Sequence, residues 1–292
     1  MPETSQNIAT GNDTAPAAVQ PPQHDLRREL RDFAWFLVKF ALLVLIIRSF
    51  VFSSFNIPSE SMQPRLLIGD YLLVNKMAYG YTRHSLPFSA PLMPGRVLGR
   101  MPTRGDVAVF KAPPGNRTDY IKRVIGLPGD RIQVVDGVVR INDVPVQRRQ
   151  IADLVIPASA NMIAASHGNP CFRPTFEVMG EGAQLTCHYP RFVETLPGGR
   201  SYQVLDLVLG DADTTGVYQV PEGHLFLMGD NRDRSYDSRF PAAEDAGIGM
   251  VPLDNLVGEA WVTIFSTDGS ARWYNPLSWF TAARWGRIGE GF

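Results

Sequence analysis

The longest apolar run in the chain lies near the N-terminus, at residues 33–47 (FAWFLVKFALLVLII). Only Lys39 interrupts it, so it lacks the polar face that a buried amphipathic helix would show. It begins too far into the chain for a cleaved signal peptide, and no small-x-small site follows it. A membrane span needs about 20 residues, which the run reaches if it continues through Phe55 while Lys39 and Arg48 extend toward opposite interfaces. The pattern therefore predicts a single membrane-spanning helix.

The segments before this run predict its orientation. Residues 1–24 are rich in Ala, Pro, Thr and Gln and have no apolar periodicity, which is typical of a disordered tail. Arg27, Arg28 and Arg31 come next. The positive-inside rule therefore places the tail in the cytoplasm and the chain after Ser53 outside it.

Beyond the helix the hydrophobic pattern changes to short β-prone runs bounded by Gly, Asp or Pro. These runs are residues 71–74, 107–110, 132–135, 138–141, 224–228 and 256–265. Asp136-Gly137, between two of them, favours a tight hairpin. Helical and strand patterns do not alternate, so a parallel α/β sheet is not expected. We predict a mostly β chain in which a transmembrane helix precedes an antiparallel β-sheet domain with an inserted β-rich lobe.

Composition narrows the possible functions. The 28 Lys and Arg residues balance 29 Asp and Glu residues, and no zinc-knuckle spacing or basic, aromatic-interleaved stretch occurs. A nucleic-acid partner is therefore not expected. The 26 Gly and 23 Pro residues suit a turn-rich β protein.

Cys171 and Cys187 are the two cysteines of the sequence. In a reducing compartment they would be small buried hydrophobes, whereas in an oxidising one an isolated pair favours a disulfide. Cys187-His188 as half of a metal site is a weaker alternative, because no further cysteine or paired-histidine motif accompanies it. Placement outside the cytoplasm favours the disulfide, which would stabilise the fold by about 3 kcal/mol.

Two serines lie on a proline-bounded segment shortly after the predicted membrane exit, at residues 57–64 (IPSESMQP). Pro58 and Pro64 restrict the backbone and disfavour regular secondary structure, so Ser59 and Ser61 are expected on a stiffened loop. Taken alone, this segment is more typical of a hydroxyl-rich turn that joins a helix to a strand, because Ser-x-Ser is common.

A lysine with unusual surroundings lies in residues 120–126 (YIKRVIG). The strand period of two puts Lys122 on one face with Tyr120 and Val124, and Arg123 on the other face. A buried Tyr120/Val124 face would hold the Lys122 amine against apolar surface, and buried lysines are rare unless they are paired or functional. The alternative is an edge strand with both cations in water.

Together these segments resemble a family, the bacterial type I signal peptidases (leader peptidases). The matching motifs, in the family's order, are residues 58–70 (PSESMQPRLLIGD), 104–107 (RGDV), 120–130 (YIKRVIGLPGD) and 229–239 (GDNRDRSYDSR). The resemblance implies a serine endopeptidase that removes signal peptides from exported preproteins after small-x-small sites, without a metal or cofactor. The domain built around the strands would then be catalytic.

The resemblance also implies roles for individual residues. Ser61 would be the nucleophile and Lys122 its general base, with the Ser61 amide and the Ser59 hydroxyl holding the oxyanion. Ser235 would orient Lys122. The supporting ion pairs would be Asp237 with Arg239 and Arg123 with Asp230. Shallow apolar pockets accepting Ala but not Leu would be lined by Ile57, Pro58, Met62, Leu66, Tyr120 and Ile121.

A lysine base is consistent with the rest of the sequence. The five histidines lie in no triad motif, and no Gly-x-Ser-x-Gly elbow occurs. A lysine at its usual pKa is only about 0.1% neutral near pH 7.5, a handicap of roughly 4 kcal/mol. Because burial lowers the pKa of a lysine by up to several units, we predict a neutral Lys122 hydrogen-bonded to Ser61.

The sequence departs from the family pattern in three places. Glu60 stands between the serines where a glycine is frequent, and Arg65 stands where a threonine is common. The family often has two N-terminal membrane helices, and one is visible here. None of these differences removes a catalytic group.

The predicted organisation follows from the pattern and the resemblance together. It comprises a cytoplasmic tail (1–24), a signal-anchor helix (25–52), a catalytic domain in two parts (53–137 and 220–272), an inserted lobe (138–219) and an aromatic-rich C-terminal tail (273–292). The resemblance implies a single-pass protein of the bacterial inner membrane with its catalytic domain on the periplasmic side. Its partners would be secretory preproteins, membrane lipid and the nearby translocation channel.

Two alternatives remain open. The first is a specialised relative that processes a pilin, since such enzymes share the same motifs. The second is a membrane-tethered periplasmic binding module whose serines are structural. The second alternative predicts unchanged function after Ser61→Ala or Lys122→Ala.

Overall fold

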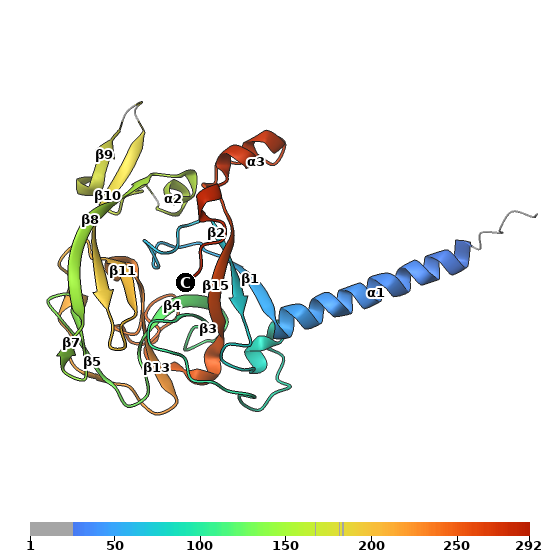
Figure 1. Cartoon of the computed structure of the whole chain (residues 1–292), viewed down its shortest axis with the longest axis horizontal. Helices are drawn as coiled ribbons and strands as arrows, with labels where there is room; N and C mark the ends of the chain where they lie inside the picture. The colour runs from blue at the N-terminus through green and yellow to red at the C-terminus, as the bar shows by residue number, and fades with distance from the viewer. Residues whose placement is uncertain (1–25, 167, 181, 183) are drawn as a thin grey trace, which may run out of the picture. The chain divides into compact units, whose positions relative to one another are not determined.

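The computed structural model describes residues 26–292 except residues 167, 181 and 183. The tail predicted at residues 1–24 lies outside the described residues. The chain divides into two compact units, residues 1–44 and residues 45–292. Helix α1 accounts for the described part of the first, and all the strands belong to the second (Figure 1).

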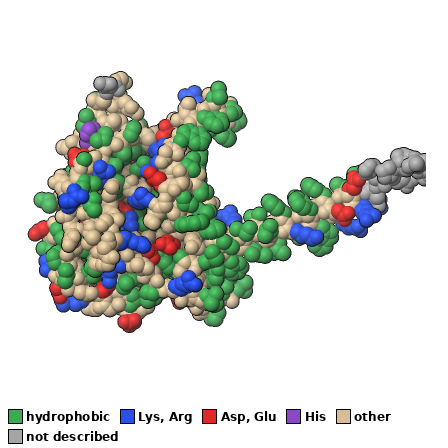
Figure 2. Space-filling view, viewed as in Figure 1, with side chains coloured by type: hydrophobic (Ala, Val, Ile, Leu, Met, Phe, Trp, Pro, Cys, Tyr) green, Lys and Arg blue, Asp and Glu red, His purple; other side chains and the backbone are tan. Residues whose placement is uncertain are grey.

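Helix α1 (Leu26–Phe50) is apolar on nearly all sides, and its hydrophobic side chains are exposed along its length (Figure 2). Its 25 residues, with a mean hydropathy of 2.1, make it long and apolar enough to cross a membrane. The expectation that the helix continues through Phe55 is wrong, because residues from Phe52 onward form strand β1. The helix gains its length instead at its N-terminal end, where residues 26–32 are helical.

The main sheet has seven strands in the order β1-β2-β15-β3-β4-β13-β14, and every neighbouring pair is antiparallel. The strands are β1 (Phe52–Asn56), β2 (Asp70–Asn75), β15 (Leu256–Ser266), β3 (Val107–Lys111), β4 (Asp119–Gly126), β13 (His224–Met228) and β14 (Val251–Pro252). The sheet thus joins segments from both ends of the second unit. This antiparallel architecture confirms the predicted fold class.

A second sheet contains the predicted hairpin. Its order is β12-β5-β6-β7, formed by β12 (Tyr218–Gln219), β5 (Arg131–Val135), β6 (Val138–Ile141) and β7 (Val144–Pro145). Asp136 and Gly137 connect β5 to β6 with positive φ angles of 50° and 75°. Both turn residues adopt the left-handed backbone that an Asp-Gly hairpin requires.

A third sheet has the order β11-β10-β8, and β9 also pairs with β10. Its strands are β8 (Gln147–Pro157), β9 (Glu177–Met179), β10 (Leu185–Thr195) and β11 (Ser201–Leu205). Figure 1 shows the long strands β8 and β10 on the opposite side of this unit from β2 and β15. Two short helices, α2 (Ala160–Ala165) and α3 (Pro276–Ala282), also occur in this unit.

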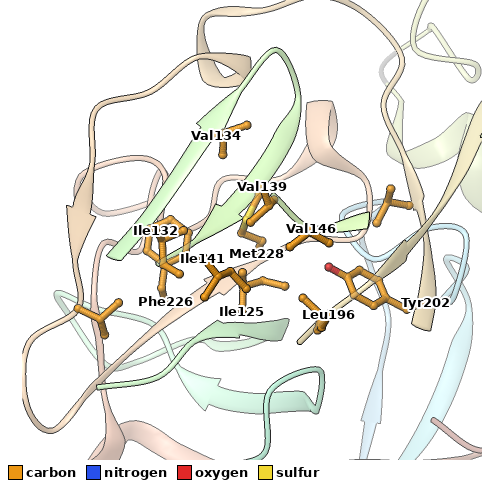
Figure 3. Packing of buried hydrophobic residues seen from close by; sticks show 12 residues of the cluster. Ile125, Ile132, Val134, Val139, Ile141, Val146, Leu196, Tyr202, Phe226 and Met228 are labelled. Carbon is orange, nitrogen blue, oxygen red and sulfur yellow. The ribbon is translucent and has the colours of Figure 1, made fainter. Parts of the chain in front are cut away.

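One hydrophobic core joins the three sheets (Figure 3). Ile125 and Phe226 come from the main sheet, Ile132 and Val139 from the hairpin, and Tyr202 from β11. Burial of one continuous apolar cluster between them stabilises the inserted segments against the main sheet.

Cys171 and Cys187 form the predicted disulfide. Both are buried in a second cluster with Tyr189 and with Ile68, which follows the proline-bounded serine loop. Because both sulfur atoms are bonded to each other, the alternative of a metal half-site at Cys187-His188 is wrong. The disulfide therefore lies in a core that also supports the loop carrying the two serines.

Candidate active site

Ser61 and Lys122 are adjacent in the structure although 61 residues separate them in the chain. The loop after β1 carries Ser61, and β4 carries Lys122, paired in register with Ala108 of β3. The Lys122 Nζ and Ser61 Oγ atoms are 2.6 Å apart, and both side chains are buried. Strand β4 lies inside the main sheet, so its hydrogen bonds to both neighbours fix the position of the amine.

Burial lowers the pKa of Lys122 to about 8, against the opposing effect of the negative charges on Asp237 and Asp230. The amine also lies 5.8 Å from the ring centroid of Tyr120, on the strand face that the sequence period predicts. A lysine with a pKa of about 8 is about one-tenth neutral at pH 7. Lys122 can therefore accept a proton from Ser61 at a pH where an ordinary lysine cannot.

Two hydrogen-bond donors lie beside the Ser61 hydroxyl. Ser59 Oγ is 3.3 Å from Ser61 Oγ. Among the described residues, the Ser61 backbone N–H donates to no protein atom. A hydroxyl and an amide beside the nucleophile are the groups from which an oxyanion hole is built.

Ser235 lies beside this pair without the hydrogen bond expected of it. Its hydroxyl is buried and has no partner among the described residues, so its predicted bond to Lys122 is not formed. Gly229 explains why Ser235 can come so close. A Cβ atom at Gly229 would clash with Ser235 Oγ and with the Ser61 carbonyl oxygen, so only glycine lets these backbones meet.

Asp237 and Arg239 form a fully buried ion pair, with Oδ1 2.9 Å from the Arg239 Nε atom. Asp237 also accepts a hydrogen bond of 3.0 Å from the Gly229 N–H. Burial alone would raise the pKa of Asp237, but Arg239 and the Gly229 N–H lower it overall. The carboxylate is therefore charged, and it anchors the glycine against which Ser235 packs.

Arg123 forms its ion pair on the other face of β4. Its guanidinium donates two hydrogen bonds, of 2.7 and 2.6 Å, to the Asp230 carboxylate. It also lies 4.3 Å from the ring centroid of Tyr202 on β11. Both faces of β4 are therefore covered at this point, one by the serine loop and the other by the third sheet.

A cavity of about 300 Å³ opens onto Ser61 and Lys122. Four of the predicted substrate-binding residues line it: Ile57, Pro58, Tyr120 and Ile121. Met62 and Leu66 do not line it. They are fully buried in a hydrophobic cluster with Leu72 and Val107, because the turn after Ser61 directs them into the core.

Several residues of the cavity wall were not found from the sequence. They are Phe55, Asn56, Val109, Thr118, Asp119, Arg234 and Tyr236. Arg234 and Tyr236 flank Ser235, so their place in the 229–239 motif was the available signal. The others come from strands β1, β3 and β4 and from Thr118 just before β4, and a sequence does not specify which neighbours these residues face.

One group of carboxylates could face a metal ion. Oxygen atoms of Asp206, Asp213 and Asp233 lie within 4.8 Å of one another. Asp206 already pairs with Arg148, and the other two accept backbone N–H bonds. Each of the three carboxylates therefore has at least one hydrogen-bond donor within the protein.

The sequence matches the family profile "Signal peptidase, peptidase S26" over residues 30–265. It is 37% identical to a signal peptidase I of Rickettsia typhi over 234 residues, which is 77% of this chain and 76% of the relative. It is 35% identical to a signal peptidase I of Rickettsia prowazekii over 251 residues, or 83% of this chain and 81% of the relative.

Proposed function

Because this chain belongs to the signal peptidase family, peptidase S26, we propose that it removes signal peptides from exported preproteins with Ser61 as nucleophile and Lys122 as general base. The 2.6 Å separation of their reactive atoms carries the assignment of the two roles. A serine hydroxyl is a poor nucleophile until a base takes its proton. The lowered pKa of Lys122 supports that role for its amine.

In both acylation and deacylation, the Lys122 amine first accepts a proton and then donates it. Ser61 Oγ attacks the carbonyl carbon of the scissile peptide bond while its proton moves to Lys122 Nζ. The resulting ammonium then donates that proton to the departing amine, and an ester between Ser61 and the signal peptide remains. A water molecule then attacks the ester carbonyl carbon while its proton moves to the neutral Lys122 Nζ. Lys122 returns that proton to Ser61 Oγ as the ester C–O bond breaks, and the signal peptide leaves with a free C-terminal carboxyl group.

The tetrahedral intermediates need donors for the negative charge on oxygen. The Ser61 N–H and the Ser59 hydroxyl would supply them, and each such donor typically lowers the barrier by about 2.7–4 kcal/mol. Ser59 is exposed, so its hydroxyl is free to turn toward the substrate. The Ser235 hydroxyl, which is buried and has no partner among the described residues, would orient Lys122 during the reaction.

The cavity suits a substrate with small side chains before the cleaved bond. Its volume is about 300 Å³, and apolar side chains such as Ile57 and Ile121 line it. We propose that the small side chains of a small-x-small sequence pack against these walls, as in the family that the chain belongs to. This preference is consistent with preproteins as the substrate class.

The proposed location is the bacterial inner membrane, with α1 as a single span and the catalytic domain on the periplasmic side. The three arginines before α1's apolar run support this orientation. Membrane lipid and the exit of the translocation channel would then be neighbours. Tethering enzyme and substrate to one membrane raises their effective concentration without new contacts.

Cleavage of a reporter preprotein by the full-length chain in detergent tests the function. Wild type should release a mature product whose N-terminus follows a small-x-small site. Ser61→Ala should lower the rate at least 10³-fold while circular dichroism stays unchanged. A wild type that cleaves no preprotein would leave the binding-module alternative standing, and equal cleavage by Ser61→Ala would exclude Ser61 as the nucleophile. A wild type that cuts a pilin precursor but no generic preprotein would identify the specialised relative.

A further inference from the structure

An ion pair connects the two loops that meet at the candidate active site. Glu60 lies between Ser59 and Ser61, and Arg234 immediately precedes Ser235. The Arg234 Nε and Glu60 Oε2 atoms are 3.0 Å apart, although 174 residues separate them in the chain. The pair thus spans from the loop of the nucleophile to the loop of Ser235.

The two partners differ in burial. The Glu60 side chain is 4% exposed and the Arg234 side chain 34% exposed. The second oxygen of Glu60 has no hydrogen-bond partner among the described residues. A buried carboxylate without a cation is strongly unfavourable, so the present position of the serine loop depends on Arg234.

Arg234 is itself held by an aromatic ring. Its guanidinium carbon lies 5.1 Å from the ring centroid of Phe172, within the range of a cation–π contact. Phe172 has a positive φ of 67°, a left-handed backbone that is unfavourable for a bulky side chain. Cys171, its direct neighbour, is cross-linked to Cys187 on β10, which fixes this strained position.

We propose that Phe172, Arg234 and Glu60 form a brace through which the loop closed by the Cys171–Cys187 disulfide positions Ser61 for attack. The proposal rests on the proposed function of Ser61. Arg234 is a positioning residue: it acts on the nucleophile through Glu60 and does not take part in the chemistry. A shift of about 1 Å in the serine loop would break the Ser61–Lys122 contact, and errors of that size commonly lower rates by up to a hundredfold.

Through the brace, the inserted lobe would help to position the serine loop at the active site. Glycine, which is frequent in the family at position 60, lets a loop adopt many conformations. Glu60 restricts this loop through a partner instead. The Arg234 side chain also lines both the cavity at Ser61 and the neighbouring cavity that extends to Asp213. A shift of either loop would therefore change the contacts of Arg234.

The test compares kcat and KM of Arg234→Gln, Glu60→Gln and the double variant on a reporter preprotein, using full-length protein in detergent. Burial raises the pKa of Glu60 and Arg234 opposes that rise. Arg234→Gln removes both the charge and the hydrogen bond that hold Glu60, so kcat should fall about tenfold while KM stays within about twofold. The double variant leaves no buried charge and should recover most of the loss. Phe172→Ala should lower kcat in the same direction by a smaller factor.

Arg148 offers a matched control. It pairs with Asp206 at 2.6 Å and lies 3.8 Å from the Phe192 ring centroid, so it has the same two kinds of partner. It lines a different hollow that includes no active-site residue. Arg148→Gln should change the thermal midpoint and leave kcat unchanged, and Arg234→Lys, which keeps the cation, should retain more activity than Arg234→Gln.

Three results would overturn the brace. The first is an Arg234→Gln variant with wild-type kcat, and the second is a double variant no faster than Arg234→Gln. The third is an equal loss of kcat in Arg148→Gln, which would mark a general effect of lost stability. Failure of the proposed function looks different, because wild type would then cleave nothing or Ser61→Ala would cleave normally.

Discussion

Lys76 and Lys122 are two buried lysines in one domain with different neighbours. Their exposed fractions are 6% and 4%, and burial lowers the pKa of each to about 8. Lys76 Nζ donates a hydrogen bond of 2.7 Å to the Ser85 carbonyl oxygen. Lys122 Nζ instead lies 2.6 Å from the Ser61 hydroxyl oxygen.

The difference between the lysines lies in the partner. A carbonyl oxygen carries no proton, so a neutral Lys76 has nothing to deprotonate and its hydrogen bond closes a loop. A hydroxyl has a proton to give, and a neutral amine beside it is a base. Burial lowers the pKa of both lysines, but only Lys122 contacts a hydroxyl group that it could deprotonate.

The largest expected effect comes from replacing Lys122 by methionine, with Lys76→Met as the comparison. Lys122→Met should lower kcat/KM for a reporter preprotein at least 10³-fold, because the base is lost. Lys76→Met should stay within about threefold of wild type. Initial rates with both full-length variants measure the contrast, and comparable losses in the two would remove the distinction drawn between them.

The pH dependence of cleavage sharpens the comparison. In the proposed mechanism the neutral form of Lys122 is the active one, so kcat/KM of wild type should rise about tenfold per pH unit below its pKa of about 8 and level off above it. Lys76→Met should leave this profile unchanged, although Lys76 titrates in the same range. If the inflection disappeared in Lys76→Met, the titrating group would be Lys76 and not Lys122.

The smallest effect concerns stability. Unfolded Lys76 has a pKa near 10.4, and the folded value is about 8. Between these values the unfolded chain binds more protons, so wild-type stability rises with pH through this window. Lys76→Met should therefore be more stable than wild type near pH 7, by about 1 kcal/mol, and lose that advantage toward pH 10. Thermal midpoints of both proteins at the two pH values test this prediction. A stability advantage of Lys76→Met that grew with pH would contradict it.

Local features of the structure were accessible from the sequence. The Asp136-Gly137 hairpin was predicted because a tight turn depends on the backbone preferences of its own residues. The opposite directions of Lys122 and Arg123 followed from the period of a strand. The apolar character of α1 was visible for the same reason, although its ends were not, since β pairing of residues 52–56 competed with the helix.

Features that depend on distant neighbours were missed. Met62 and Leu66 were expected in the substrate pocket, but the turn after Ser61 directs them into a core formed with Leu72 and Val107. The Glu60–Arg234 pair joins residues far apart in sequence. Nothing within either motif specifies that these two side chains meet.

The sequence by itself determined which groups this protein can use: an apolar helix, a serine loop, a strand lysine and four motifs in order. It could do so because helix and strand periods, turn chemistry and charge are properties of neighbouring residues. Only the tertiary structure decided that Lys122 reaches Ser61 while Lys76 reaches a carbonyl, and that the disulfide loop reaches Glu60 through Arg234. Those contacts depend on how three sheets pack around shared cores, and packing is a property of the whole fold.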